Sequence, residues 1–112
     1  MKPQEFTLAL VQMQVKGGDK AWNIRHAVEL IAEAASNGAD VALLPECMDL
    51  GWTHPSCLTM AEPIPDGAFC QALVHAAKQH RIFVCAGLTE KAGSQVFNSA
   101  TVSYTHLTLP TN

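Results

Sequence analysis

The chain has 112 residues, of which 48% are apolar and 15% are charged, and its formal net charge at pH 7 is −3. This length and composition suit one small globular domain with a modest core. With no lysine or arginine cluster, the charge argues against a surface for nucleic acid or an anionic membrane, so we expect a small-molecule substrate. No segment near the N-terminus is long and apolar enough for a signal peptide or membrane span, and a cytoplasmic location is the default expectation.

The first part of the chain predicts a strand, an amphipathic helix and a second strand. Residues 6–13 are rich in strand formers and indicate a buried first strand. Asp19 is placed to cap a helix, and apolar residues then recur at intervals of three and four as far as Ala35. Gly38 is expected to end this helix in a left-handed conformation. The order strand, helix, strand predicts a right-handed crossover between two parallel strands.

The second strand, residues 41–44, is the segment around which the rest of the chain is organised. It is an unbroken apolar run, the pattern of a strand buried on both faces in a parallel sheet. Pro45 ends it, because proline has no N–H for the ladder and keeps Leu44 extended. Glu46 is thereby placed at the carboxyl end of the strand, the edge at which open α/β sheets bind ligands.

The second part of the chain predicts a long connection, a helix and a hairpin. Residues 47–67 contain three prolines and little periodicity, and long irregular segments of this kind are usually functional. A second helix is expected to start at Asp66-Gly67, followed by a third buried strand over residues 82–87. After the turn residues 92–94, the alternating segment 96–102 is expected to pair antiparallel with that strand.

The four cysteines, at positions 47, 57, 70 and 85, are widely and irregularly spaced. No Cys-x-x-Cys pair and no histidine at zinc-ligand spacing accompanies them, so the sequence indicates neither a zinc site nor a disulfide framework. We expect Cys57, Cys70 and Cys85 to behave as small buried hydrophobes. Cys47 adjoins Glu46 as a nucleophile beside its base would, but adjacent residues that leave a strand tend to point apart, so we expect Cys47 to pack as well.

Glu46 is the one candidate catalytic residue that the sequence provides by itself. A lone carboxylate at a strand end is more often solvated or capping than catalytic. Other familiar sites are missing, because the Gly17-Gly18 turn lacks the G-x-G-x-x-G spacing and the chain has neither a P-loop nor a G-x-S-x-G elbow.

Several short motifs follow one another along the chain: Leu10-Val11-Gln12-Met13, Asn23, Asn37-Gly38-Ala39-Asp40, Leu44-Pro45-Glu46, Gly51-Trp52, Gly67, Phe83 to Gly87, Glu90 and Phe97-Asn98-Ser99-Ala100. In this order and spacing they resemble the N-terminal part of the nitrilase superfamily, the carbon–nitrogen hydrolases. The resemblance extends over residues 6–102. It implies an α/β fold that is part of a four-layer αββα sandwich, here a βαβ-loop-αββ fragment, with residues 1–102 forming the N-terminal part of a hydrolase domain.

The resemblance also implies a reaction, the hydrolysis of a small amide, nitrile or carbamoyl amine by a Glu-Lys-Cys triad in which Glu46 is the general base. It implies no cofactor and no metal, and an intact enzyme that self-associates. Trp52, His54 and Asn98 become candidates for the wall of the substrate pocket. The alternative for the first two is a loop anchored by a buried tryptophan with an exposed histidine.

The lysine and cysteine of the triad have no counterpart in this chain. In the family the lysine lies one hairpin beyond the Asn-Ser strand, where this chain has Tyr104 followed by Thr105-His106-Leu107, and Lys91 precedes that strand. We therefore expect the chain to be the first third of an enzyme and to be inactive and poorly folded alone, because helices on one side of the sheet leave its other apolar face uncovered. Two other hypotheses stay open, a non-enzymatic α/β binding module in which Glu46 contacts a ligand, and a glutaminase-type domain that supplies ammonia to a synthetase.

Residues 103–112 are predicted to be a non-native tail. Residues 102–111 read Val-Ser-Tyr-Thr-His-Leu-Thr-Leu-Pro-Thr, which is the translation of a sequencing-library transposase adaptor, GTC TCT TAT ACA CAT CTG ACG CTG CCG ACG. Segments of this origin are excluded from reasoning about the fold. We expect no functional role for Tyr104 or His106 and only weak packing beyond Ser103.

Overall fold

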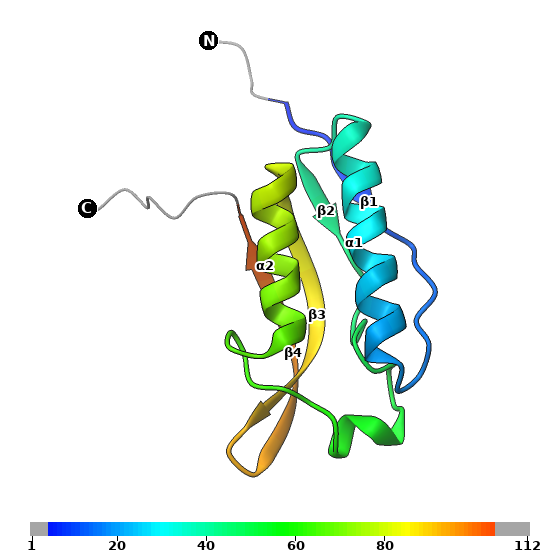
Figure 1. The fold of residues 1–112 in the computed structure, drawn as a ribbon, viewed down its shortest axis with the longest axis vertical. Coiled ribbons are helices and arrows are strands. Elements are labelled where there is room, and N and C mark those ends of the chain that lie inside the picture. The colour runs from blue at the N-terminus through cyan, green and yellow to red at the C-terminus, as the bar shows by residue number, and fades with distance from the viewer. Residues whose placement is uncertain (1–4, 105–112) are drawn as a thin grey trace, which may run out of the picture.

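A computed structural model describes residues 5–104, which form one four-stranded sheet and a layer of helices (Figure 1). The strands lie in the order β1-β2-β3-β4, with β1, β2 and β3 parallel and β4 antiparallel to β3. This arrangement confirms the α/β class and the expected order of elements. The elements are β1 (Leu8–Leu10), α1 (Lys20–Ser36), β2 (Val41–Leu43), the 3-10 helix η1 (Pro55–Leu58), α2 (Ala68–His80), β3 (Phe83–Ala92) and β4 (Gln95–Ser103).

Helix α1 begins and ends where the sequence predicts. The carboxylate of Asp19 accepts a hydrogen bond from the N–H of Trp22 at 3.0 Å and so satisfies one of the free donors of the first turn. At the other end Gly38 has a φ of +87°, a conformation that glycine adopts without the steric cost of a Cβ. Among residues 5–104 neither helix is long and apolar enough to cross a membrane.

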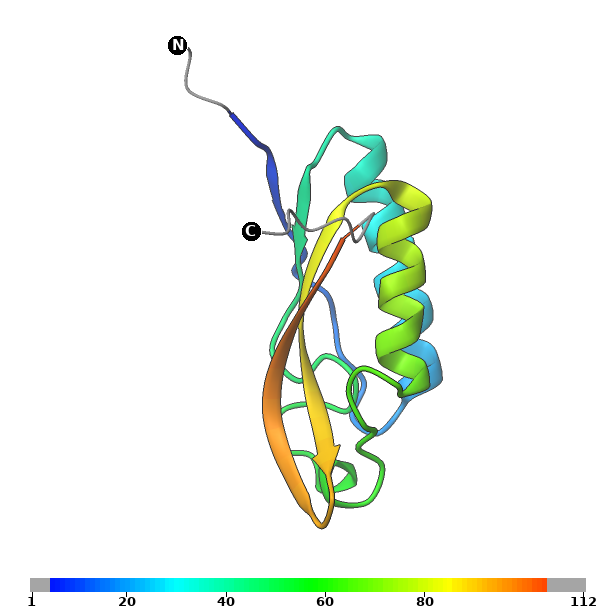
Figure 2. The same ribbon diagram turned by 90° about the vertical axis from the view of Figure 1, so that its left-hand side faces the viewer.

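The two helices cover the same face of the sheet, and Figure 2 shows both on one side of the strands. Strand residues that point to the helices are buried, as Val84, Ala86 and Leu88 show. Together with the apolar sides of α1 and α2 they form the core. Its fully buried members include Ala27, Ile31, Ala42, Leu73 and Ala77.

The three parallel strands are covered by helices on one face only, as expected for this part of the domain alone, and not on both faces as their apolar runs indicate. On the face opposite the helices, here called the uncovered face, Leu10 is 65% exposed, Phe83 47% and Leu43 39%. The apolar runs predicted burial because side chains point alternately to the two faces, and both sets are apolar. No described element lies against the second set, so its apolar side chains meet solvent.

The strand bounds also differ from those expected. Only residues 8–10 of the predicted segment 6–13 pair fully with β2, although the N–H of Val11 still donates to the carbonyl of Leu43 at 2.9 Å. The β3–β4 hairpin is longer than predicted and extends beyond the end of α2 in Figure 1. Residues 105–112, most of the predicted tail, lie outside the described residues.

Candidate active site

The turn after β2 carries Glu46 across β3 at Gly87. The N–H of Gly87 donates to the carbonyl of Pro45 at 3.1 Å, and the N–H of Met48 donates to the carbonyl of Gly87 at 2.9 Å. A Cβ at position 87 would lie 2.6 Å from the Cα of Glu46, so only glycine leaves room for this crossing. Glu46 therefore lies at the carboxyl end of β2, as the sequence predicts, with its side chain exposed on the uncovered face.

Glu46 is joined there by Asn98, which comes from β4. The side-chain Nδ2 of Asn98 donates to Glu46 Oε1 at 2.9 Å. Both residues line a cavity of about 280 Å³, together with Leu43 and Gly87. A carboxylate and an amide thus meet in a cavity at the carboxyl edge of parallel strands, the usual position of a ligand site in α/β sheets.

Cys47 lies on the other side of Asn98. Its backbone has a φ of +48°, which is uncommon for a residue other than glycine, and its side chain is buried as expected. The thiol donates to Oδ1 of Asn98 at 3.6 Å. Burial raises the pKa of the Cys47 thiol, so this group stays protonated near neutral pH. A second cavity, of about 190 Å³, is lined by Cys47 and Asn98 together with Trp52 and Phe97.

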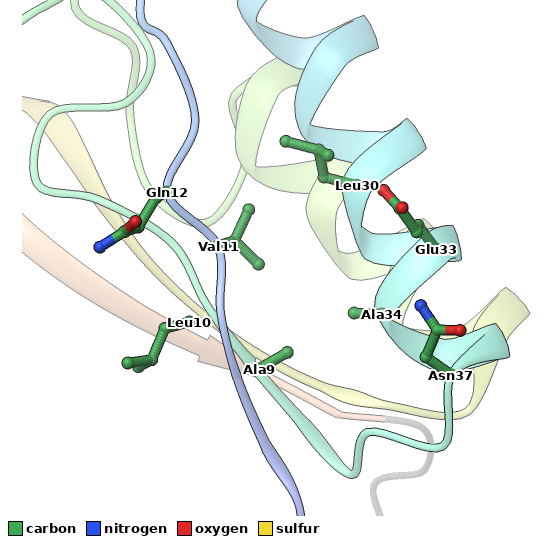
Figure 3. Close-up of a pocket in the computed structure, with 8 residues that line it drawn as sticks. All are labelled: Ala9, Leu10, Val11, Gln12, Leu30, Glu33, Ala34 and Asn37. Carbon is green, nitrogen blue, oxygen red and sulfur yellow. The ribbon is translucent and has the colours of Figure 1, made fainter.

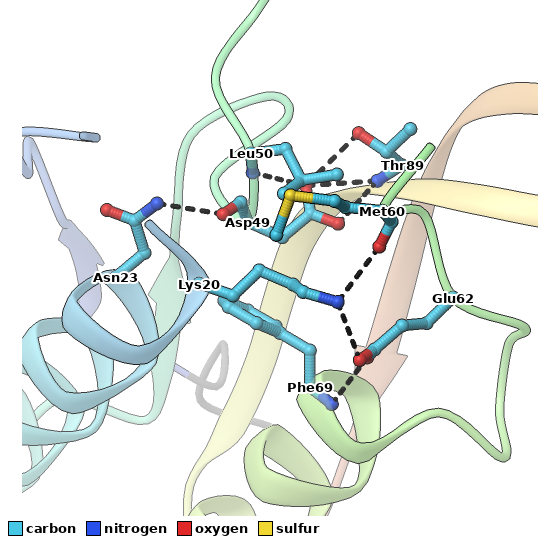
Figure 4. Close-up of polar contacts among 8 residues, drawn as sticks. All are labelled: Lys20, Asn23, Asp49, Leu50, Met60, Glu62, Phe69 and Thr89. Atoms are coloured by element: carbon cyan, nitrogen blue, oxygen red, sulfur yellow. Dashed lines mark hydrogen bonds and ion pairs between the residues drawn. The ribbon is translucent and has the colours of Figure 1, made fainter. Parts of the chain in front are cut away.

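Buried Asp49 fixes the turn that carries Glu46 (Figure 4). Its carboxylate accepts the N–H of Thr89 at 3.0 Å, the hydroxyl of Thr89 at 3.2 Å and the N–H of Leu50 at 3.0 Å. Burial raises the pKa of Asp49, while the donors of Thr89 and Leu50 partly offset this effect. Sequence reasoning missed this residue, because its partner Thr89 is 40 positions away.

Two further contacts hold the segments around the turn. Asn23, fully buried on α1, donates to the backbone carbonyl of Asp49 at 2.8 Å. Lys20 and Glu62 form an ion pair at 2.9 Å, and Glu62 also accepts the N–H of Phe69 (Figure 4). The connection between β2 and α2, although irregular, is therefore fastened to α1 and to the start of α2.

Of the other two predicted pocket residues, Trp52 lines one of the two cavities and His54 lines neither. Trp52 lines the second cavity with 67% of its surface exposed, so the buried tryptophan anchor considered as an alternative is not found. His54 lines neither cavity. Its Nδ1 accepts the N–H of Ser56 at the start of η1, and its ring lies against Gly17.

The four cysteines differ in how far they are buried. Cys70 is buried as predicted, but Cys57 and Cys85 are only partly buried, and all four thiols are free. Cys57 lines the second cavity and Cys85 lines the first. Within residues 5–104 no three histidine, cysteine, aspartate or glutamate side chains are grouped so as to hold a metal ion.

A cavity of about 200 Å³ between β1 and α1 offers a contrast (Figure 3). Figure 3 shows Val11 directed towards α1 and Leu10 directed away from it. Among the described residues, no side-chain hydrogen bond joins the polar residues that line this cavity, which are Gln12, Glu33 and Asn37. This cavity lacks the converging polar groups of the site at Glu46.

The fold is that of an α/β protein with a carboxylate at the end of β2, and comparison with known families makes the class specific. The sequence model of the family described as carbon-nitrogen hydrolase matches residues 7–104. The chain belongs to the carbon–nitrogen hydrolase family.

Curated relatives agree with this assignment. A nitrilase of Pyrococcus abyssi is 36% identical over 100 residues, which cover 85% of this chain and 37% of the relative. The omega-amidase NIT2 of Mus musculus is 35% identical over 98 residues, which cover 87% of this chain and 35% of the relative. The chain thus spans about a third of the length of the curated relatives that it matches.

Solved structures confirm the fold. A CN-hydrolase superfamily protein from Xanthomonas campestris superposes with a TM-score of 0.82 at 20% identity, over 92% of this chain and 38% of that chain. A double mutant of an amidase from Nesterenkonia sp. AN1, solved in complex with acrylamide, superposes with a TM-score of 0.78 at 20% identity, over 95% of this chain and 42% of that chain. The described residues therefore have the fold of part of a carbon–nitrogen hydrolase.

Proposed function

We propose that this chain is the N-terminal part of an amidase-type carbon–nitrogen hydrolase in which Glu46 is the general base of a Glu-Lys-Cys triad. The observation that carries the proposal is the position of Glu46, at the end of β2 in a cavity that opens on the uncovered face. The lysine and the nucleophilic cysteine would come from sequence outside this chain, and the chain alone would be inactive.

The chemistry follows from the properties of the three groups. For an amide, the carboxylate takes the proton of the cysteine thiol, and the thiolate attacks the carbonyl carbon. The protonated carboxyl group passes this proton to the departing nitrogen, which leaves as ammonia. Water, whose proton the carboxylate takes, then hydrolyses the thioester and releases the acid and the cysteine thiol. A lysine stabilises the negative charge of the tetrahedral intermediate. No metal or cofactor takes part in this scheme.

The comparisons support the amidase type. Several relatives are omega-amidases, and the Nesterenkonia amidase has been solved with one glutamate replaced by glutamine and with acrylamide added to its active-site cysteine. We propose a small amide as the substrate, held between the uncovered face and the segments that complete the enzyme. We also propose that the intact enzyme forms homo-oligomers and is located in the cytoplasm.

The test uses the full-length protein, the product of the complete reading frame that contains this chain. Ammonia release is measured from acetamide, from a terminal amide of a dicarboxylic acid and from the matching nitriles. Glu46→Gln should lower kcat by at least about a hundredfold, the usual contribution of a general base. Glu29→Gln, on the exposed side of α1, is the control. If Glu46→Gln keeps turnover within about tenfold of the native enzyme, the assignment of Glu46 as base is wrong.

A further inference from the structure

The side-chain amide of Asn98 lies between two groups of the turn after β2. Its Nδ2 donates to Glu46 Oε1 at 2.9 Å, and its Oδ1 accepts from the Cys47 thiol at 3.6 Å. Asn98 is exposed, yet both ends of its amide are engaged by residues that adjoin each other in sequence. Packing alone does not require this arrangement.

The direction of the amide follows from the chemistry of its two neighbours. The thiol of Cys47 is a donor, because burial keeps it protonated, and it therefore faces the oxygen of the amide. The NH₂ group must then face the carboxylate. The flipped amide would place its oxygen beside Glu46 Oε1, two acceptors without a proton between them, and its NH₂ beside a thiol.

The backbone pairing of β4 fixes the position of the Asn98 side-chain amide, and the Cys47 thiol fixes its direction. Asn98 is paired with Thr89 in the register of the β3–β4 hairpin, and Thr89 is in turn bound to Asp49 of the same turn that carries Glu46. The turn and the hairpin therefore hold each other at two points. These contacts bring Asn98 and Glu46 together.

We propose that Asn98 is a positioning residue that occupies Oε1 of Glu46 and leaves Oε2 as the oxygen that exchanges protons during the reaction, and that Cys47 orients the amide for this task. Oε2 receives no hydrogen bond from any residue within 5–104. A carboxylate that accepts a hydrogen bond at one oxygen keeps the lone pairs of the other free for proton transfer. The inference rests on the proposed role of Glu46 and changes Asn98 from a wall of the substrate pocket into a partner of the base.

The test compares kinetic constants of variants in the full-length protein, with acetamide as substrate. Asn98→Asp keeps the size of the side chain but replaces the donor by an acceptor. It should lower kcat by about ten- to hundredfold, the loss expected for one hydrogen bond to a charged group, and leave KM within about threefold. Thr101→Val is the matched control, because Thr101 lies on the same strand three residues from Asn98 and therefore on the opposite face of the sheet.

Variants of Cys47 test whether its thiol orients the amide of Asn98. They keep the proposal testable even if Asn98→Asp does not fold. Cys47→Ser keeps a donor, whereas Cys47→Ala removes it, and both keep a Cβ at the same positive φ. Cys47→Ser should stay within about threefold of the native kcat and Cys47→Ala should fall about five- to tenfold below it. A structural role alone would lower the melting temperature of both variants without separating their kcat values.

Three results would overturn the inference. The first is an Asn98→Asp variant with raised KM and native kcat, which would mark a substrate contact. The second is native kcat and KM in that variant, and the third is equal kcat values for Cys47→Ser and Cys47→Ala. If Glu46→Gln is inactive while Asn98→Asp retains native kcat, only this inference fails. If Glu46→Gln retains turnover, the proposed function fails first.

Discussion

Gly87 lies so close beneath Glu46 that a Cβ at position 87 would come within 2.6 Å of the Glu46 Cα, and within 2.9 Å of the carbonyl oxygen of Pro45. These atoms belong to backbone, which cannot turn aside as a flexible side chain can. The glycine is therefore part of the candidate site, although it has no functional group.

Gly87→Ala should destabilise the full-length protein by about 2–3 kcal/mol, because the turn must move away from β3 to make room. It should also lower kcat, since Glu46 moves with the turn. Denaturant unfolding and amide hydrolysis measure the two effects. Gly93→Ala is the control, because nothing lies within 4 Å of its added Cβ and only its φ of +62° costs energy, about 1 kcal/mol. If Gly87→Ala and Gly93→Ala lost the same stability and the same activity, the close contact between Gly87 and the turn would not be the cause.

Asp49 makes the stability of the protein depend on pH. Because its pKa is raised above the ordinary value of 3.8, the folded state holds this proton more tightly than the unfolded state does. The contribution of Asp49 is thus fully present below pH 3.8 and is lost as the pH rises through the pKa of the folded state.

Asp49→Asn should remove this dependence and keep an acceptor for Thr89 and Leu50. Its free energy of unfolding, relative to that of the native protein, should therefore rise as the pH is raised above 3.8 and level off once the pH has passed the raised pKa of the folded state. Asp49→Ala leaves the same donors unpaired and should cost about 2–3 kcal/mol. Urea unfolding at several pH values checks both, and a native-like pH slope in Asp49→Asn would contradict the assignment.

The uncovered face predicts the behaviour of the 112-residue chain by itself. Leu10, Leu43, Phe83 and Val102 expose apolar surface there, and a patch of this kind drives association. The chain should elute as aggregates in size-exclusion chromatography and should hydrolyse no amide. Phe83→Lys should raise the soluble fraction, whereas Leu58→Lys, at an isolated residue that is 78% exposed, should not. A soluble native monomer with a sharp cooperative melt would count against this prediction.

The adaptor origin of residues 102–111 is tested on the DNA. Sequencing of the source with a ligation-based library should give a different continuation after about Thr101, with the lysine motif of the family one hairpin further on. Recovery of the same ten codons, in frame and followed by a stop, would show that the tail is native.

The local features of the fold could be predicted from the sequence, since the Asp19 cap, the left-handed Gly38 and the turn at Gly93 each depend on near neighbours. The position of Glu46 also followed, because Pro45 ends the strand. The contacts of Asp49 with Thr89 and of Glu46 with Asn98 could not be predicted, because they join residues 40 and 52 positions apart. Their distances depend on the hairpin register and on how the turn crosses β3, and no local pattern specifies either.

The pairing of β3 with β4 has a consequence for the order in which the molecule folds. A hairpin between neighbouring segments closes within about 1–10 μs, whereas the parallel pairing of β2 with β3 must wait until the chain between them, including α2, has been placed. We therefore expect Asn98 to reach its strand position early and Glu46 to arrive opposite it only when β3 docks on β2. Partial unfolding that separates these two strands would dismantle the candidate site and leave the hairpin intact.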